Sequence, residues 1–204
     1  DGPRAGEGYF SPDGTHLTLM SEREPGNPFY QIYDLDLTMG DARRISPGIG
    51  KTTCSFFQPG TGAIIFSSTH HDPLSGEFQR QELEFRASGQ ERRYAWDYDP
   101  EMEIYVTDPT GGDLTRLTNA RGYDAEGSYS PDGEWIVFSS NRQAYDHELS
   151  DEEQAFEALA PIVVACLDTE EEEVALPISM IRQLTADALW ARSHYGAAAA
   201  KGAD

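Results

Sequence analysis

Apolar side chains recur at every second position in three short segments, and each segment follows a proline-centred bend. Superposing Pro12, Pro59 and Pro131 brings apolar residues into register five and seven positions later. A period of two is typical of a β-strand with one buried face. The aligned residues are Leu17, Ile64 and Ile136, followed by Leu19, Phe66 and Phe138.

The bends have the composition of β-turns. GYFSPDGTHLTLMS (8–21) and GSYSPDGEWIVFSS (127–140) match almost position for position, and CSFFQPGTGAIIFSS (54–68) is a weaker copy. Proline presets φ at the second turn position, aspartate bonds the backbone that follows it, and glycine tolerates a left-handed conformation. We therefore expect each copy to form an antiparallel hairpin.

A second pair of strands is predicted after each hairpin. In the first two repeats an apolar strand is followed by another at the same thirteen-residue spacing, from Ile32 to Ile45 and from Ile104 to Leu117. The third set is looser, with PIVVACLD (161–168), an acidic run and MIRQLT (180–185).

Four short strands per repeat are the content of one β-propeller blade. The sequence thus predicts an all-β chain with about three blades of four antiparallel strands and two short helical insertions. This partial propeller spans residues 1–185, and residues 186–204 are expected to form a flexible tail. The blade-like repeats lie at about 7–46, 53–118 and 126–185.

The repeat resembles that of the TolB-like β-propellers, in which an SPDG hairpin is followed by strands containing IY-x-x-D and LT. In this chain the match rests on Phe10 to Gly14, Tyr129 to Gly133, Ile104 to Gly111 and Arg116 to Thr118. The resemblance implies a rigid scaffold, periplasmic or extracellular in bacteria, that binds proteins or small ligands at the mouth of its channel. The same blades occur as the gating domain of serine peptidases of the prolyl oligopeptidase group.

Three blades are too few for a closed ring, which needs about four to eight. We expect either that this chain is a segment of a longer protein, or that a protein partner or further blades complete the ring. Two copies would supply six blades, the number that a TolB-type ring uses, so a homodimer is the alternative.

The charge of the chain bears on its partners. The chain carries 36 acidic and 15 basic residues, a formal net charge of −21. Unaided binding to nucleic acid or anionic lipid is therefore not expected, and a basic partner or a cation fits better. The longest apolar runs fall short of the ~20 residues that a membrane helix needs. The first residues lack the pattern of a signal peptide, so any leader is either absent or already removed.

Residues 69–103 are predicted to be an insertion between the second and third strands of the second repeat. Ser75 as an N-cap and Gly89 as a stop predict a short surface helix, with Phe78, Leu83 and Phe85 as its apolar positions. A second insertion at 144–160 carries a capping box, Ser150 with Glu153, and is also expected to be helical.

The first insertion concentrates candidate metal ligands. Imidazole with carboxylate suits zinc or iron, and carboxylates alone suit calcium, so a divalent cation is the one candidate cofactor. The alternative is that the alternating acids of DYDPEME (97–103) share the solvated face of a strand. The candidate ligands are His70, His71, Asp72, Asp97 and Asp99, with Glu101 and Glu103 nearby.

Three aromatic residues of the same insertion, Tyr94, Trp96 and Tyr98, are candidates for binding a protein partner. Aromatic side chains dominate interface energetics when they are well buried. The alternative is that these side chains fill the groove between blades.

The sequence contains no catalytic motif among those searched. G-x-S-x-G, H-E-x-x-H and G-x-G-x-x-G are absent, and GIGKTT (48–53) lacks the first glycine of a phosphate-binding loop. Cys54 and Cys166 lie in apolar runs where cysteine acts as a small hydrophobe, with a disulfide between them as the lesser alternative. We therefore expect a non-catalytic binding scaffold; the alternatives are the accessory propeller of a larger serine hydrolase and a metal-binding propeller.

Overall fold

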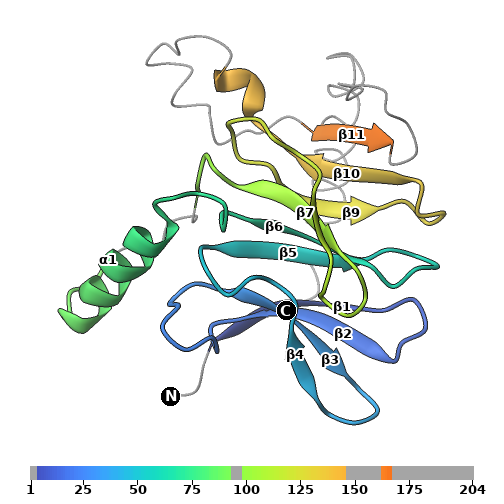
Figure 1. The fold of residues 1–204 in the computed structure, drawn as a ribbon, viewed down its shortest axis with the longest axis horizontal. Coiled ribbons are helices and arrows are strands. Elements are labelled where there is room, and N and C mark those ends of the chain that lie inside the picture. Colours follow the sequence, from blue (N-terminus) through green and yellow to red (C-terminus); the bar gives the residue numbers. More distant parts are fainter. Residues whose placement is uncertain (1–3, 93–97, 146–161, 167–204) are drawn as a thin grey trace, which may run out of the picture.

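The computed structural model describes residues 4–92, 98–145 and 162–166, which form three antiparallel sheets (Figure 1). We call these sheets blades A, B and C. Strands that follow one another in sequence lie side by side, in the orders β1-β2-β3-β4, β5-β6-β7-β8 and β9-β10-β11. The bounds are β1 (Ala5–Phe10), β2 (His16–Ser21), β3 (Gln31–Asp36), β4 (Ala42–Arg44), β5 (Thr52–Phe57), β6 (Ile64–Ser68), β7 (Glu103–Thr107), β8 (Leu114–Arg116), β9 (Ala125–Tyr129), β10 (Trp135–Ser139) and β11 (Ile162–Cys166).

The SPDG segments form the predicted turns. In blade A the N–H of Gly14 donates to the carbonyl of Ser11 at 2.9 Å, and the Asp13 carboxylate accepts the N–H of Thr15 at 3.0 Å. Gly14 has a φ of 72°, a conformation that glycine adopts without steric cost. The SPDG turn of blade C repeats each of these features.

The thirteen-residue spacing of the second strand pair also has a direct cause. The N–H of Ile45 donates to the carbonyl of Ile32, and the N–H of Leu117 donates to that of Ile104, each at 2.8 Å. The residue that follows each donor, Ser46 or Thr118, accepts the N–H of the same isoleucine through its hydroxyl. The spacing therefore fixes the register of the two outer strands in both blades.

The core lies between blades, where the apolar faces of neighbouring sheets meet. One cluster joins blade A to blade B, and a second joins blade B to blade C. The first contains Met20, Ile32 and Ile45 of blade A with Phe57, Ile64, Phe66 and Tyr105 of blade B, and the second contains Ile65 and Ile104 of blade B with Tyr129, Ile136 and Phe138 of blade C. The prediction of a separate antiparallel sheet for each repeat is thus confirmed.

The two ends of the blades differ. Because successive strands alternate in direction, the short hairpin turns after β1, β3, β5, β7 and β9 gather at one end, which we call the turn end. The connections after β2, β6 and β10 and the links between blades gather at the other, which we call the insertion end. Figure 1 shows α1 (Ser75–Ala87) projecting from the insertion end, away from the turns.

The helix α1 confirms one predicted insertion and corrects its start. Ser75 is not the N-cap, which is Leu74 and lacks a side-chain cap. The Ser75 hydroxyl instead donates to the carbonyl of Thr69 at 2.6 Å, so it ties the helix to the end of blade B. Gly89 has a φ of 68° just beyond the C-cap, as a stop signal requires.

Polar contacts attach α1 to blade A. The Arg86 guanidinium pairs with Glu22 in the β2–β3 connection, and the Gln79 amide oxygen accepts the N–H of Gly50 at 2.9 Å. Two of the predicted apolar positions, Phe78 and Leu83, remain 36% and 42% exposed. The helix is therefore a surface element held by hydrogen bonds and ion pairs.

The remaining predictions lie partly or wholly outside the described residues. β11 confirms a third strand for blade C, whereas the predicted fourth strand at 180–185, the helix at 144–160 and the tail at 186–204 are not described. A short 3-10 helix, Arg142–Tyr145, follows β10. Within the described ranges, no helix has the length and apolar character needed to cross a membrane.

Candidate functional site

The first strands of the three blades share an unusual backbone feature. β1, β5 and β9 each contain a β-bulge with a non-glycine residue at positive φ: Glu7 (26°), Cys54 (41°) and Glu126 (62°). Each residue stands five positions before the proline or equivalent of its turn. We call these three residues the axial triplet, since β5 packs against both β1 and β9, the first strands of the neighbouring blades.

The backbone of the axial triplet is strained because all three residues have positive φ and none is glycine. A non-glycine residue with positive φ costs about 1–3 kcal/mol, and such strain is concentrated at active sites and ligand-binding sites. Bulges also re-aim side chains and are common next to binding sites. Three equivalent bulges therefore give one side chain of each blade a special direction.

Two side chains of the axial triplet, Glu7 and Cys54, are in contact, and Glu126 lies close enough for its charge to act on Cys54. The Cys54 thiol donates to the Glu7 carboxylate at 3.2 Å and contacts the Thr53 hydroxyl at 3.2 Å. The Tyr9 ring lies beside the Phe56 ring with centroids 5.6 Å apart. The site thus combines two solvent-exposed carboxylates, a buried thiol and an aromatic edge.

Burial and mutual repulsion set the protonation of this site. The Glu126 side chain is only partly exposed, and this partial loss of solvent raises its pKa, with the charge of Glu7 adding to the effect. Burial likewise raises the pKa of Cys54 to about 12, so its sulfur is a neutral thiol at physiological pH. The thiolate, not the thiol, is the reactive form of cysteine. The arrangement suits recognition of a positively charged group and does not activate Cys54 as a nucleophile.

Cys54 behaves as predicted in its burial and its structural character. Its thiol is free, so the alternative of a disulfide with Cys166 is wrong.

The candidate metal ligands that are described each have a protein partner. The His70 ring contacts the Ser68 hydroxyl at 3.0 Å, and burial lowers the pKa of His70 to about 4. The Asp72 carboxylate accepts the N–H of Leu74, and the Asp99 carboxylate lies 3.2 Å from the Lys51 ammonium. Asp72 and Asp99 are thereby used in local structure.

His71 occupies the place in blade B that Glu24 occupies in blade A, three residues after the last serine of the second strand. Both contact a tyrosine hydroxyl of the third strand and an arginine of the fourth strand. The contacts are Tyr33 and Arg44 to Glu24 at 3.3 and 2.6 Å, and Tyr105 and Arg116 to His71 at 2.8 and 3.2 Å.

The contacts with Tyr105 and Arg116 set the tautomer of His71. Because a guanidinium only donates, the Nε2 atom facing Arg116 must be the acceptor, and Nδ1–H donates to Tyr105. Burial and then the Arg116 charge lower the pKa of His71. The lone pair that a metal would need is therefore taken by Arg116.

The alternative interpretation, that the acids of 97–103 share the solvated face of a strand, is wrong for Asp99 and Glu103. Asp99 and Glu103 are 4% and 2% exposed. Glu103 begins β7 and accepts hydrogen bonds from Arg116 at 2.7 Å and from the Thr118 hydroxyl, while Glu101 lies in the preceding turn.

No group of three or more His, Cys, Asp or Glu side chains in the described part of the chain is arranged to hold a metal ion. Asp97 lies outside those residues, so a metal site that includes it stays a prediction.

Of the three candidate partner-binding aromatics, Tyr94 and Trp96 lie outside the described residues. Tyr98 is half-buried between blades B and C. Its ring stacks on Tyr123 with centroids 5.5 Å apart, and its hydroxyl contacts Tyr145 and accepts a hydrogen bond from Asn141 at 2.9 Å. Tyr98 therefore fills an inter-blade groove, as the alternative interpretation stated.

The same junction contains a fully buried carboxyl group. Asp124 is 0% exposed, pairs with Arg142 through one carboxylate oxygen, and has no hydrogen-bond partner for the other. Burial raises the pKa of Asp124 to about 6, although the Arg142 charge opposes this shift. We therefore expect the Asp124 carboxyl group, which is buried between blades B and C, to titrate near pH 6.

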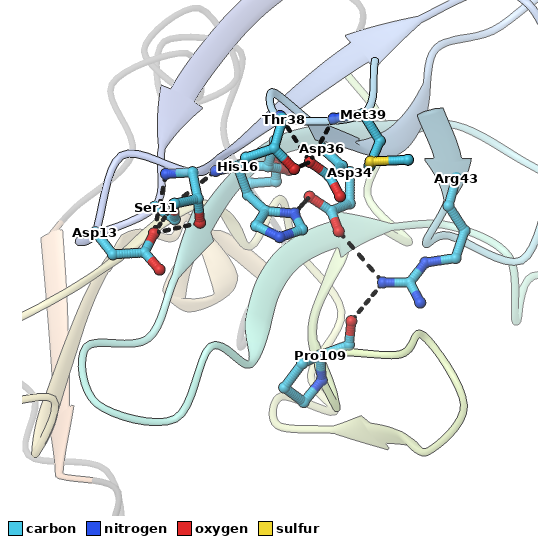
Figure 2. Close-up of polar contacts among 12 residues, drawn as sticks. Ser11, Asp13, His16, Asp34, Asp36, Thr38, Met39, Arg43 and Pro109 are labelled. Carbon is cyan, nitrogen blue, oxygen red and sulfur yellow. Dashed lines mark hydrogen bonds and ion pairs between the residues drawn. The ribbon is translucent and has the colours of Figure 1, made fainter. Parts of the chain in front are cut away.

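A histidine–aspartate pair at the turn end of blade A, His16 with Asp34, does not form a catalytic triad with the nearby Ser11. Figure 2 shows the His16 ring hydrogen-bonded to one carboxylate oxygen of Asp34. The other oxygen of Asp34 pairs with the Arg43 guanidinium, and Arg43 also donates to the carbonyl of Pro109 in blade B. The Ser11 hydroxyl donates to Asp13 and meets only the backbone N–H of His16. Ser11 is therefore a turn residue, as predicted.

Comparison with known proteins supports the fold. No protein-family model matches the chain. A solved structure of a protein designated TolB from Agrobacterium tumefaciens is 21% identical, with a TM-score of 0.52 over 83% of this chain and 50% of that chain. TolB from Acinetobacter baumannii is 21% identical, with a TM-score of 0.51 over 84% of this chain and 32% of that chain. The tricorn protease is 14% identical, with a TM-score of 0.50 over 80% and 14% of the two chains.

A curated relative, the uncharacterized peptidase YuxL of Bacillus subtilis (strain 168), is 22% identical over an alignment of 148 residues that covers 68% of this chain and 22% of that protein. The chain spans half or less of the length of each of these proteins. The structural similarity shows that the described residues have the β-propeller fold of the TolB structures.

Proposed function

We propose that this chain is a non-catalytic, TolB-like propeller scaffold that binds a protein partner or ligand in an exported, periplasmic or extracellular assembly. The axial triplet supports the proposal most directly, because three blades repeat a strained bulge, with Glu7 in contact with Cys54 and the charge of Glu126 acting on Cys54. A scaffold needs rigid elements behind its contact residues, and the inter-blade clusters supply them.

The chemistry of the axial triplet indicates what kind of group it receives. The carboxylates of Glu7 and Glu126 are exposed, and their mutual repulsion is relieved by a nearby positive charge. We therefore expect an amine or guanidinium group of the partner or ligand to dock there. The net charge of −21 favours the approach of such a partner.

A capture experiment with matched charge changes tests this function. The tagged chain would be incubated with exported proteins of the producing organism, and bound proteins identified by mass spectrometry. Glu7→Gln with Glu126→Gln should reduce capture at least about tenfold, the effect of losing roughly 1.4 kcal/mol of binding. The control, Asp41→Asn with Glu134→Gln at the turn end, removes the same charge and should capture as the wild type does. Equal loss in both variants, or equal capture by both, would refute binding at the axial triplet.

A second function, the accessory propeller of a larger serine hydrolase, is favoured by the similarity to the peptidase YuxL and the tricorn protease. This function predicts a peptidase domain in the complete reading frame that contains this chain. It also predicts that adding the chain to that domain restricts cleavage to short peptides. A complete reading frame without a hydrolase domain would exclude it.

A further inference from the structure

Arg86, near the C-terminal end of α1, places its guanidinium among oxygen atoms of the β2–β3 connection of blade A. Its Nη1–H and Nη2–H groups donate to the two carboxylate oxygens of Glu22 at 3.1 and 3.2 Å. Nη2 also donates to the Pro28 carbonyl at 2.9 Å, and Nε–H donates to Glu82 of the helix itself at 2.7 Å. Three oxygen atoms of blade A thus receive one guanidinium group.

The Glu22 carboxylate is largely shielded from water. Its side chain is 10% exposed, whereas both partners of a typical surface ion pair remain in water and contribute little. Arg4 donates to one oxygen of Glu22 at 2.9 Å and helps to orient the carboxylate. The equivalent positions of blades B and C are Thr69 and Asn141, so among the three blades this carboxylate is particular to blade A.

The helix that supplies Arg86 is attached to the blades by polar contacts. The buried residues of α1 are Ser75 and Glu82, and no side chain of α1 belongs to the apolar clusters of the described residues. Ser75 and Gln79 attach the first half of the helix to the ends of the blades. The second half therefore depends on Arg86 for its described polar contacts with blade A.

We propose that Glu22 and the Pro28 carbonyl form a binding site for an arginine side chain of a protein partner, and that Arg86 occupies this site until the partner displaces it. The planar guanidinium fork matches a carboxylate through two parallel hydrogen bonds, which the ammonium of lysine cannot reproduce. The net charge of −21 favours the approach of a basic partner. Displacement would release the second half of α1 and leave the apolar clusters between the blades intact.

Arg86 acts in this scheme as an intramolecular competitor. A group tethered close to its site has an effective concentration of about millimolar or more, so free guanidinium compounds should bind weakly while Arg86 is present. Removing Arg86 should therefore strengthen their binding. Removing Glu22 should abolish the binding, although it also releases the helix. These opposite effects distinguish a binding site from an ion pair that only stabilises α1.

Titration by nuclear magnetic resonance, with matched variants of the whole 204-residue chain, tests the proposal. The probes are N-acetylarginine amide and N-acetyllysine amide, which each carry one positive charge on the side chain and no other charge. Every protein also carries Glu7→Gln and Glu126→Gln, so that binding at the axial triplet does not contribute. The backbone amide signals of Glu22 and Phe29 report on the site.

The Arg86→Ala protein should bind the arginine probe at least about tenfold more tightly than the protein that retains Arg86, because the competitor is gone. It should bind the lysine probe at least about fivefold more weakly than the arginine probe. Adding Glu22→Gln should reduce binding of the arginine probe at least about tenfold. The control is Arg80→Ala, which removes the same charge from an arginine that pairs with Glu77 and Glu84 of the same helix. This control should bind the probe as weakly as the protein that retains Arg86 does.

Hydrogen exchange of α1 shows whether the probe displaces Arg86. In the protein that retains Arg86, a saturating concentration of the arginine probe should speed exchange of the amides of 82–87 by at least about threefold. The amides of 78–81, which follow the anchored first turn, should change less. Arg86→Ala should speed exchange at 82–87 without any probe, and Arg80→Ala should not.

Four results would overturn the proposal. They are no gain in binding with Arg86→Ala, equal binding of the two probes, unchanged binding after Glu22→Gln, and saturation without faster exchange at 82–87. Circular dichroism and thermal unfolding establish that the blades of each variant are folded. If Glu22→Gln unfolds the chain, Glu22→Asp replaces it, since it withdraws the carboxylate by one methylene and should weaken binding in the same direction. Because the axial triplet is neutralised throughout, a failure here would leave the capture result unchanged.

Discussion

Blades A and B have the same strand order and the same repeat, yet their apolar residues have different surroundings. Phe57 in blade B is 5% exposed, and the equivalent Phe10 in blade A is 67% exposed. Among the described residues, blade B has a neighbour on both faces and blade A on one, which accounts for the difference. The repeat therefore encodes contacts between sheets, and a single blade has no core of its own.

The largest expected effect comes from truncating the two equivalent phenylalanines. Phe57→Ala should lower the free energy of unfolding by about 3–5 kcal/mol, because it opens a cavity between blades A and B. Phe10→Ala should change it by less than about 1 kcal/mol, since the side chain is already exposed. Urea denaturation of the two variants measures both changes. Similar losses in the two variants would contradict the assignment of the core to blade interfaces.

The next largest effect is expected at the junction of blades B and C, where Asp124 has no equivalent carboxyl group in blade A or B. Burial raises its pKa from 3.8 to about 6, so the folded chain holds a proton that the unfolded chain has released within that window. Its contribution to stability therefore falls as pH rises from about 4 to 6 and is constant above. Relative to Asp124→Asn, which does not titrate, the wild type should lose on the order of 1–3 kcal/mol across this window. Chemical denaturation of both proteins at a series of pH values measures the difference, and a constant difference would show that Asp124 does not titrate there.

A smaller effect of opposite sign is expected at His70, which contacts the strand-end Ser68 as Arg23 contacts Ser21 in blade A. Burial lowers the pKa of His70 from 6.5 to about 4, so the unfolded chain binds a proton that the folded chain refuses. Stability should therefore fall as pH decreases from about 6.5 to 4. Because His70 is only half-buried, we expect a loss of about 1 kcal/mol relative to His70→Gln. A nuclear magnetic resonance titration of the His70 ring gives the pKa directly, and a midpoint near 6.5 would exclude the effect.

The smallest effect concerns the bulge that the blades share. At an ordinary φ, alanine is more stabilising than glycine by about 0.4–1 kcal/mol. At Glu7, with a φ of 26°, the order should reverse, so that Glu7→Gly is more stable than Glu7→Ala by about 0.5–1 kcal/mol. Both variants lack the carboxylate, so the difference in their thermal unfolding reports only the effect of the backbone conformation on stability. An alanine variant that is the more stable one would show that the bulge is not strained.

Much of the fold was predictable because period-two patterning and turn chemistry are local. The proline superposition placed Ile64 and Phe66 on one buried face, and the thirteen-residue spacing located the outer strands of blades A and B. The start of α1 was not predictable from the same kind of signal, because Ser75 uses its hydroxyl for a contact with Thr69 that only the folded chain provides.

The candidate site was harder to predict. The proline superposition already aligned Glu7, Cys54 and Glu126, but none of these is glycine, so nothing in their composition indicated a left-handed bulge. The density of acids and histidines in 69–103 indicated a metal. In the structure, Asp99 pairs with Lys51 and Glu103 with Arg116, residues far away in sequence. Long-range pairing of this kind is not encoded in local patterns.

Hydrogen exchange monitored by mass spectrometry tests most directly whether contacts between blades determine stability. The measurement would use the unmodified 204-residue chain. If contacts between blades determine stability, amides of β5, β6 and β7, which have a blade on each side, should exchange more slowly than the equivalent amides of β1, β2 and β3. Equal protection in blades A and B would contradict it, because each sheet would then be stable without its neighbours.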